Sequence, residues 1–322
     1  MALSLKQLRY FTALAEAGHF GRAADKVHVS QPALSTQIKE LEVFLGVDLV
    51  ERMPREIRLT RAGQDVLDRS RRILAEVGDL EQAVRWRNGL AGRLQIGMIP
   101  TIAPYLLPPA LALLRARDLT LDIRIREAQT DALIHALRRG QLDAAVLALP
   151  VAEPGLAATD ILEDHFVLAG SRAALSGWGA RAEALRPTAI DPDRLLLLDE
   201  GHCLADQALE ICKLPSRRQV DLGASSLSTL CGLVAGGFGL TLLPELALRT
   251  ELAAAPDLMV LRFRKPQPSR RIALVYRTGS SATEWAADLA GLMADAGAEL
   301  ISHARKVCQG PAGGIGKKAK SG

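Results

Sequence analysis

The sequence predicts a small all-α winged helix-turn-helix domain, a long linker helix, and an α/β domain built of two Rossmann-like subdomains. Three observations support this fold class. Three short helical patterns and a hairpin pattern occupy residues 1–60, a seven-residue apolar repeat occupies residues 61–90, and strand and helix patterns alternate from residue 91. Regular alternation of strands and helices is typical of an α/β domain with a largely parallel sheet.

The first three helices follow from apolar spacing and cap residues. Apolar side chains recur every three or four positions within residues 4–17, a shorter helix is expected at 22–27, and the third helix begins after Ser30. Ser30 has the side chain of an N-cap and Pro32 suits a first turn, while Gly46 ends the pattern. Two helices joined by a tight turn in this way form a helix-turn-helix.

The third helix is a candidate for reading DNA. Its early exposed positions carry side chains that can hydrogen-bond base edges or phosphates in a major groove, namely Gln31, Ser35, Thr36 and Lys39. Residues 49–52 and 57–59 form a hairpin pattern that carries Arg52, Arg55 and Arg58, which suit a wing against the phosphate backbone. An ordinary three-helix cap with a hairpin remains the alternative.

A long helix is expected from residue 61 to about residue 88. Val66, Ile73 and Leu80 repeat every seven residues, and a second stripe lies four positions later at Ser70, Val77 and Val84. Such a two-stripe heptad seam is typical of a helix that pairs with a copy of itself. The alternative is a core helix of one domain, but the long polar faces favour a dimer.

The remaining chain alternates between strands and helices. Strands are expected at 94–98, 121–127, 144–148, 166–170, 195–198, 240–243 and 272–276, and helices at 101–114, 130–140, after 225 and at 283–302. Crossovers near residues 164 and 265 divide this region into subdomain I (91–164 and 265–303) and subdomain II (165–264). Ligands of such sheets bind beyond the carboxyl ends of the strands, so we expect a cleft between the subdomains.

The segment 201–212, GHCLADQALEIC, contains two cysteines nine residues apart. Leu204, Ala208 and Ile211 recur at helical spacing, which predicts a short helix over residues 204–212 and places Cys203 at or near its N-terminus. Nine residues of helix span about 13 Å. A disulfide needs Cα atoms about 4.4–6.8 Å apart, so the two cysteines cannot bridge unless the helix unwinds. The segment is therefore either an inert pair of thiols or a redox-driven conformational switch.

Composition narrows the function classes. The net charge of the whole chain is +4. Residues 304–322 contain five basic residues and no acidic one, so the rest of the chain has a net charge of about −1. This Gly- and Lys-rich tail is expected to be disordered, and global basicity is no argument for DNA binding. No CxxC or CxxH spacing indicates a metal, and no pattern indicates a cofactor, an export signal or a membrane span. Four cysteines in such a chain suggest a cytoplasmic protein with reduced thiols, with Cys231 buried and Cys308 exposed.

Dense motifs in residues 5–63 resemble those of the LysR-type transcriptional regulators. They are F-x-A-L-A-E at 11–16, F-x-R-A-A at 20–24, V-S-Q-P-A-L-S-x-Q-I-x-x-L-E at 29–42, L-G-V-x-L-x-E-R at 45–52 and T-x-A-G at 60–63. The resemblance implies a two-lobed, periplasmic-binding-protein-like regulatory domain over residues 91–303. It also implies that Ser30, Gln31, Pro32 and Ser35 belong to the DNA-reading helix.

Within this family the chain is most similar to the peroxide-sensing members. The similar segments are 96–108, 127–130, 201–212, 241–244 and 272–280. The resemblance implies that Cys203 reacts with hydrogen peroxide and that Cys212 resolves the product as a disulfide. The implied peroxide-binding residues are Thr101, Thr130, His202, Asp206 and Arg270. A helix N-terminus and Arg270 would lower the pKa of Cys203, whereas Asp206 and Glu200 would raise it.

The resemblance also implies the partners. They are promoter DNA, hydrogen peroxide, RNA polymerase, a cytosolic thiol reductant, and further copies of the chain in a homotetramer formed as a dimer of dimers. Sensing would be stoichiometric, so the protein would not be an enzyme. The alternative is a regulator of the same architecture that binds a small organic effector between the subdomains, with incidental cysteines.

Overall fold

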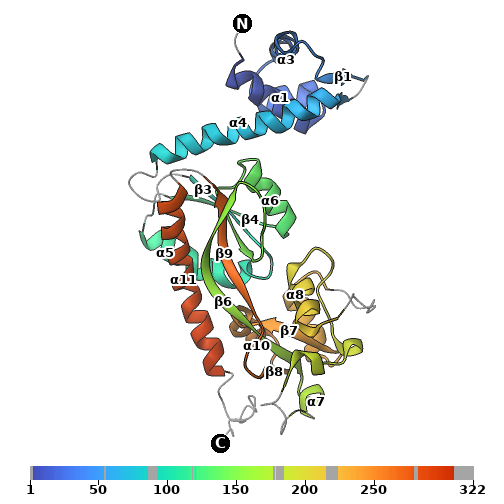
Figure 1. Cartoon of the computed structure of the whole chain (residues 1–322), viewed down its shortest axis with the longest axis vertical. Helices are drawn as coiled ribbons and strands as arrows, with labels where there is room; N and C mark the ends of the chain where they lie inside the picture. The colour runs from blue at the N-terminus through green and yellow to red at the C-terminus, as the bar shows by residue number, and fades with distance from the viewer. Residues whose placement is uncertain are drawn as a thin grey trace, which may run out of the picture. The chain divides into compact units, whose positions relative to one another are not determined.

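The computed structural model describes residues 3–53, 56–85, 93–117, 119, 121–176, 178, 185–214, 224–278 and 282–307. The chain divides into two compact units, one formed mainly by residues 1–87 and the other mainly by residues 88–322. Each unit is built around its own buried core. Figure 1 shows the elements of both units.

The first unit is a helix-turn-helix followed by a two-stranded wing. Its elements are α1 (Leu5–Ala17), α2 (Phe20–Lys26), α3 (Gln31–Leu45), β1 (Val50–Arg52), β2 (Ile57–Leu59) and α4 (Arg61–Arg85). The apolar stripes of α1 and α3 meet in one core, in which Phe11, Leu14, Leu34, Ile38 and Leu41 are completely buried. The predicted fold of this region is confirmed.

Cap residues set the helix ends of this unit. The Ser30 hydroxyl accepts a hydrogen bond from the Ala33 N–H, and Gly18 and Gly46 end α1 and α3 with φ of 65° and 71°. The second helix begins at Phe20 rather than at residue 22. His19 causes this earlier start, because its Nδ1 accepts a hydrogen bond from the Gly21 N–H at 3.0 Å and so satisfies a free donor of the first turn.

Helix α4 leaves part of its predicted seam exposed. Val66 packs against the core of the first unit, whereas the Ile73 and Leu80 side chains are 41% and 67% exposed. Ser70 is buried, and the side chain of Val84 and the expected end at residue 88 lie outside the described residues.

The second unit contains one mixed sheet covered by helices. Its strands are β3 (Arg93–Met98), β4 (Asp122–Glu127), β5 (Ala144–Ala148), β6 (Leu156–Ser171), β7 (Leu240–Pro244), β8 (Leu258–Arg262) and β9 (Ser269–Arg277). Its α-helices are α5 (Ala103–Arg117), α6 (Thr130–Arg138), α7 (Arg172–Leu175), α8 (Cys203–Cys212), α9 (Leu227–Ala235), α10 (Leu248–Ala254) and α11 (Ala282–Val307). Helices α5 and α11 pack against each other (Figure 1). Helix α9 packs against β6, β7 and β8.

The sheet is less parallel than the sequence pattern indicates. The strand order is β4-β3-β5-β9-β6-β7, with β8 also paired to β6. Among the strands that the structure describes, the pairs β3–β4 and β3–β5 are parallel, and the pairs formed by β6 and β9 are antiparallel. The reason is the connection between the subdomains, since the chain crosses on β6 and returns on β9 in the opposite direction.

Several expected elements differ at their ends or in kind. Strand β6 begins at Leu156 rather than at residue 166, and α5 covers Ala103–Arg117 rather than 101–114. Residues 195–198 form no strand, and only Leu195 and Leu198 make isolated bridges, to Leu240 and Ala224. Helix α11 continues to Val307, beyond the expected end at residue 302 and into the expected tail. Ala304 is completely buried there, which explains why the helix persists. The rest of the tail, from Cys308 to residue 322, lies outside the described residues.

The crossing strands place two charged side chains opposite each other. On β6, pairing with β9 ends at His165 and pairing with β7 begins at Phe166. Asp164 stands directly across from Arg270 of β9 in this register. The point where the sheet passes from one subdomain to the other is therefore also the point where the buried polar site is assembled.

Candidate functional site

Helix α8 carries both cysteines of the segment 201–212. Cys203 is its first residue and is partly buried, and Cys212 is its last residue and is buried. Both thiols are free. A straight helix separates their Cα atoms by about 13 Å, which is too far for a disulfide. The structure therefore holds the dithiol form of the segment.

A buried guanidinium organises the groups beside Cys203. Arg270 donates hydrogen bonds from Nη1 to the Thr101 hydroxyl at 3.0 Å and from Nη2 to the Thr101 carbonyl at 3.1 Å. Its Nε donates to Asp164 Oδ2 at 3.0 Å, and the Leu246 N–H donates to Asp164 Oδ1 at 3.1 Å. All three side chains are almost completely buried. A buried charge is tolerated only when it is paired and hydrogen-bonded, and this network meets that condition.

The neighbouring arginine lies on the opposite face of β9. Arg271 is exposed and pairs with Asp160 at 2.6 Å. Successive side chains of a strand alternate between its faces, so one of these two arginines had to be buried and the other exposed. Arg270 is the one that faces the interior and Thr101.

Burial dominates the pKa of the Cys203 thiol. It raises the pKa above its ordinary value, and the Asp206 charge adds to that rise. The Arg270 charge and the Thr130 hydroxyl lower the pKa without reversing the shift. The expected balance of charges at the helix N-terminus therefore omits the largest effect, which is the loss of water around the sulfur.

Thr130 and Gln207 each bring a buried polar atom to this region without an ordinary partner. Thr130 begins α6, and its hydroxyl is directed at the Cys203 sulfur. Among the described residues, neither Thr130 Oγ1 nor Gln207 Oε1 makes a hydrogen bond of standard geometry. Buried polar atoms are rarely left unpaired, so these two are candidates to bind a small polar molecule.

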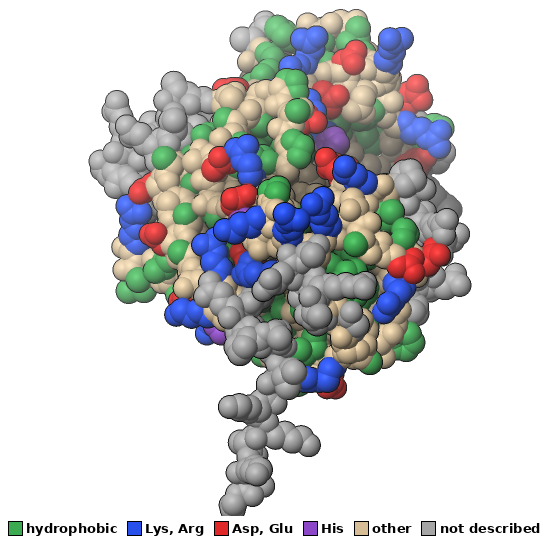
Figure 2. Space-filling model, turned by 60° about the horizontal axis from the view of Figure 1, so that its bottom comes forward, with side chains coloured by type: hydrophobic (Ala, Val, Ile, Leu, Met, Phe, Trp, Pro, Cys, Tyr) green, Lys and Arg blue, Asp and Glu red, His purple; other side chains and the backbone are tan. Residues whose placement is uncertain are grey.

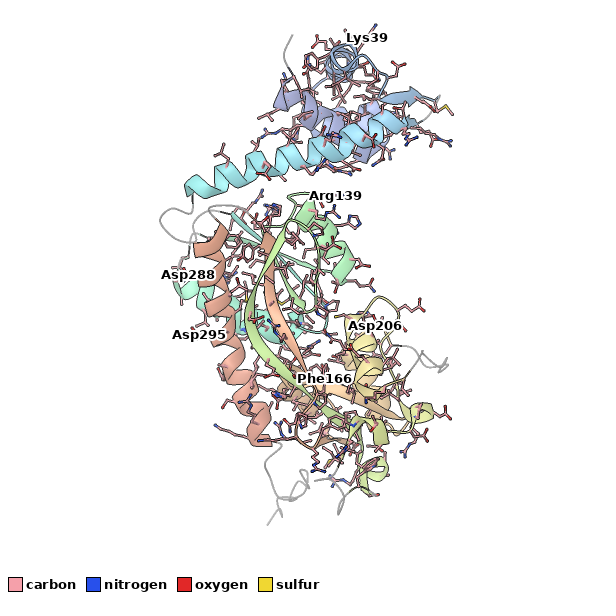
Figure 3. The ribbon with its side chains drawn as sticks, in the orientation of Figure 1. Lys39, Arg139, Phe166, Asp206, Asp288 and Asp295 are labelled. Atoms are coloured by element: carbon pink, nitrogen blue, oxygen red, sulfur yellow. The ribbon has the colours of Figure 1, made fainter. Side chains whose placement is uncertain are left out.

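The other expected site residues differ in burial. His202 is buried and precedes α8 as its N-cap residue, although its side chain makes no capping hydrogen bond. Asp206 lies on the exposed side of α8 (Figure 3). The structure thus gathers Cys203, Thr101, Thr130 and Arg270, while Asp206 acts on the thiol through its charge.

Sequence reasoning did not single out Asp164, Gln207 or Gln129 for this site. Gln207 follows Cys203 by four residues, a spacing that places both on one helix face and could have identified it. Asp164 lies in a strand 106 residues before its partner Arg270, and no local pattern indicates that pairing. Gln129 donates from Nε2 to the Glu200 carbonyl at 3.2 Å.

Cys212 and Cys231 are both buried. Burial raises the pKa of Cys212 to about 11. Cys231 on α9 is completely buried, and burial together with the Glu251 carboxylate raises its pKa far above the ordinary value. Within the described residues, no group of three or more His, Cys, Asp or Glu could hold a metal ion.

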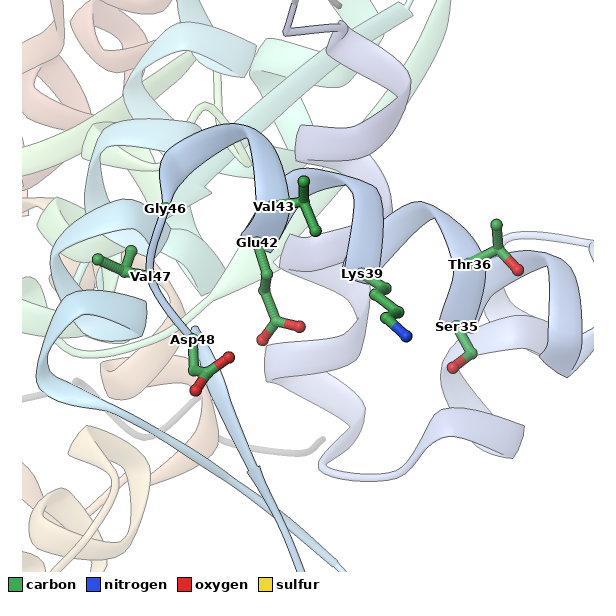
Figure 4. A pocket seen from close by; sticks show the side chains of 8 residues that line it. All are labelled: Ser35, Thr36, Lys39, Glu42, Val43, Gly46, Val47 and Asp48. Carbon is green, nitrogen blue, oxygen red and sulfur yellow. The ribbon is translucent and has the colours of Figure 1, made fainter.

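The candidate DNA-reading residues lie along one side of α3. Ser30, Gln31, Pro32, Thr36 and Lys39 are exposed. Ser35, Thr36 and Lys39 line one wall of an open groove that continues past Glu42 and Val43 to Asp48 (Figure 4).

The wing is tied to the end of this helix. Glu42 Oε1 accepts hydrogen bonds from the Leu49 and Val50 N–H groups, so the strand β1 is fixed relative to α3. The side chain of Arg52, and the whole of Arg55, lie outside the described residues.

Surface charge alone does not identify this interface. The chain has 40 basic and 36 acidic residues. On the face that Figure 2 presents, basic and acidic side chains are interspersed, with one group of basic side chains near its centre. In the part of the chain that the structure describes, no helix is both long enough and apolar enough to cross a bilayer.

Two family models match the chain. Residues 5–64 match the bacterial regulatory helix-turn-helix protein of the lysR family, and residues 87–298 match the LysR substrate binding domain.

Curated relatives match over most of their length. A protein of Streptomyces viridosporus named probable hydrogen peroxide-inducible genes activator is 43% identical over 92% of this chain and 95% of its own. The Escherichia coli K12 protein named DNA-binding transcriptional dual regulator OxyR is 40% identical over 86% of this chain and 90% of its own.

Solved structures match as well. A cysteine-to-aspartate variant of full-length OxyR from Pseudomonas aeruginosa has a TM-score of 0.71 at 32% identity and covers 96% of this chain and 100% of its own. A cysteine-to-serine variant of Corynebacterium glutamicum OxyR with bound hydrogen peroxide has a TM-score of 0.62 at 35% identity. This match covers 95% of this chain and 98% of that one.

Proposed function

Since the chain belongs to the LysR family of bacterial transcriptional regulators, we propose that it is a hydrogen-peroxide-responsive, DNA-binding regulator whose sensor is Cys203. The observation that carries this proposal is the position of Cys203. Its thiol lies among Arg270, Thr101 and Thr130 at one end of a helix whose other end is Cys212. The names of the relatives supply the stimulus, hydrogen peroxide.

In the first step, the Cys203 thiolate attacks one oxygen of hydrogen peroxide. The O–O bond breaks, the sulfur is oxidised to a sulfenic acid, and the other oxygen leaves as hydroxide and takes up a proton to become water. Arg270 donates to the Thr101 hydroxyl, so that hydroxyl accepts there and can donate its own proton to a peroxide oxygen. We assign peroxide binding to Thr101, Thr130, His202 and Arg270, and an electrostatic role to the exposed Asp206.

In the second step, Cys212 attacks the oxidised sulfur. The S–S bond forms, the S–O bond breaks, and the departing hydroxide becomes water with the thiol proton. Closing this bond requires the intervening helix to unwind, which supplies two discrete conformations of the regulatory domain. A cytosolic dithiol reductant restores the dithiol form by thiol–disulfide exchange. Each oxidation is thus a signal rather than a turnover.

The readout is promoter binding. Helix α3 presents Gln31, Ser35, Thr36 and Lys39 to a major groove, and the wing with Arg52 and Arg55 follows the phosphates. The seam of α4 pairs two chains, and two such dimers form a tetramer in which the redox state alters the spacing of the DNA-binding domains. The tetramer then changes the access of RNA polymerase to the promoter.

The decisive experiment treats the reduced full-length protein with one equivalent of hydrogen peroxide and maps its disulfides by mass spectrometry. We expect a Cys203–Cys212 bond. Cys203→Ser should keep specific DNA binding but lose the peroxide-dependent change in the footprint. Cys231→Ser is the matched control, because this thiol is buried on α9, and it should respond as the wild type does.

If Cys203 and Cys212 both remain free thiols after peroxide treatment, this proposal is wrong. That result would favour the alternative, a regulator of the same architecture that binds a small organic effector between the subdomains. Retention of the peroxide response in Cys203→Ser would move the sensor to another thiol.

A further inference from the structure

The side chain of Gln129 reaches the segment that leads into Cys203. Its Nε2 donates a hydrogen bond to the Glu200 carbonyl at 3.2 Å. Its Oε1 lies against Gly201 so closely that a Cβ there would come within 2.5 Å of it. Gly201 itself has a φ of +87°, which favours glycine. One amide side chain therefore contacts both residues that precede His202 and Cys203.

The base of this contact is rigid. Gln129 lies two residues after the end of β4, and the Ala128 N–H between them donates to the Met98 carbonyl of β3 at 3.3 Å. The Gln129 carbonyl accepts from the Leu133 N–H at 3.1 Å, which makes Gln129 the residue that begins the hydrogen-bond ladder of α6. Gln129 is thus anchored to the sheet edge and to α6, next to Thr130.

The segment that Gln129 contacts follows Asp199, whose backbone is hydrogen-bonded to Ala224. The Asp199 N–H donates to the Ala224 carbonyl at 3.0 Å, after which Glu200 and Gly201 are exposed. At the far end of α8, Cys212 is buried. Release of the Cys203 end of α8 uncovers the buried His202 and Leu204, and it requires the Gln129 contacts to break.

We propose that Gln129 is a positioning residue that holds residues 200–203 in the dithiol conformation and thereby sets the redox balance of the Cys203–Cys212 pair. The inference rests on the proposed function, in which this pair forms a disulfide. Gln129 stabilises the dithiol form alone, so removing it shifts the equilibrium towards the disulfide. The half-reaction is the reduction of the S–S bond by two electrons and two protons to two thiols.

The test measures the disulfide reduction potential of full-length Gln129→Ala in glutathione redox buffers. Loss of one net hydrogen bond should favour the disulfide by about three- to tenfold. At 29.6 mV per tenfold change, this lowers the reduction potential by about 15–30 mV. Gln129→Glu keeps the length of the side chain but cannot donate to a carbonyl, and it should shift the potential in the same direction.

Gln267→Ala is the matched control. Gln267 Nε2 donates to the Phe263 carbonyl at the same 3.2 Å, but that bond does not involve the segment before Cys203. We expect its reduction potential to equal that of the wild type. A wild-type potential in both Gln129 variants would overturn the inference and place the movement at the Cys212 end.

A second measurement separates this inference from the proposed function. In the reduced protein carrying Cys212→Ser, which cannot form the disulfide, Gln129→Ala should raise the rate of Cys203 alkylation by iodoacetamide about three- to tenfold, because the segment opens more often. This readout needs no peroxide chemistry. An unchanged rate contradicts the role of Gln129. A raised rate supports the positioning of this segment by Gln129 even if the wild-type chain forms no disulfide with peroxide, a result that contradicts only the proposed sensor.

Discussion

At the scale of single residues, Cys203 is held as a thiol by its own burial. Desolvation raises its pKa more than the Arg270 charge and the Thr130 hydroxyl lower it. Only the thiolate is nucleophilic, so reactivity is governed by how often the proton leaves the sulfur. Arg270 and Thr130 oppose this effect of burial on the pKa and so favour the thiolate that the proposed reaction needs.

This protonation state predicts a pH dependence. Because the pKa of Cys203 lies above its ordinary value, the thiolate fraction should keep rising through the pH range in which an exposed thiol is already saturated. The measurement is the rate of Cys203 alkylation and of peroxide reaction against pH. Asp206 raises this pKa, so Asp206→Asn should lower it and speed both reactions about two- to fivefold at neutral pH.

Glu210→Gln is the matched control for that substitution, since Glu210 is an exposed acid further along the same helix. It should leave both rates almost unchanged. Faster alkylation together with slower peroxide reaction in Asp206→Asn would contradict a purely electrostatic role and show that the carboxylate contacts peroxide.

At the scale of secondary-structure elements, a buried carboxylate joins three helices. Glu251 of α10 accepts hydrogen bonds from the Tyr105 hydroxyl of α5 at 2.7 Å and from the Ser228 hydroxyl of α9 at 2.9 Å. Burial and the Glu251 charge raise the pKa of Tyr105 far above its ordinary value, so the phenol remains a donor. Tyr105, four residues after Thr101 in the sequence, is thereby linked to α9 and α10.

Removing this carboxylate should destabilise the fold. Glu251→Ala leaves the buried Tyr105 hydroxyl without its acceptor and removes the partner of the exposed Ser228 hydroxyl, so we expect a loss of about 1–3 kcal/mol in the free energy of unfolding. Tyr105→Phe removes one donor and should cost about 1 kcal/mol. Urea denaturation followed by circular dichroism measures both values.

Ser176→Ala supplies the comparison for these variants. Its hydroxyl donates to the Ala173 carbonyl on an exposed part of the surface, and its loss should stay within about 0.5 kcal/mol. Equal and small effects of Glu251→Ala and Ser176→Ala would show that Glu251 does not join the helices energetically.

At the scale of the whole molecule, the exposed seam of α4 predicts assembly. Ile73 and Leu80 are large apolar side chains exposed on a helix with an otherwise polar surface. Replacing both by Asn should reduce the association state of the full chain, measured by sedimentation equilibrium, and weaken binding to a two-fold operator at least tenfold. Arg69→Asn with Glu76→Asn changes exposed polar positions of the same helix and should preserve both properties. An unchanged association state in the Ile73 and Leu80 variant would assign pairing to another surface.

The sequence alone predicted the first unit almost completely. Cap residues and apolar spacing are local signals, so Ser30, Gly18 and Gly46 placed the helix ends correctly. The start of α2 was wrong because a histidine cap is unusual and has no general signature. The extra turns of α11 were missed because the burial of Ala304 depends on its neighbours in space rather than on those in sequence.

For the candidate site, the sequence by itself determined the helix that begins at Cys203 and ends at Cys212, since both its period and its length are local properties. Only the tertiary structure decided what surrounds that thiol. The Arg270–Thr101 contact spans 169 residues, and the Asp164–Arg270 pair depends on the register of two antiparallel strands. Burial, which raises the pKa of Cys203 most, is likewise a property of the packed chain. Local spacing determines which residues share a helix face, whereas the loss of water around a sulfur atom depends on every segment that packs against it.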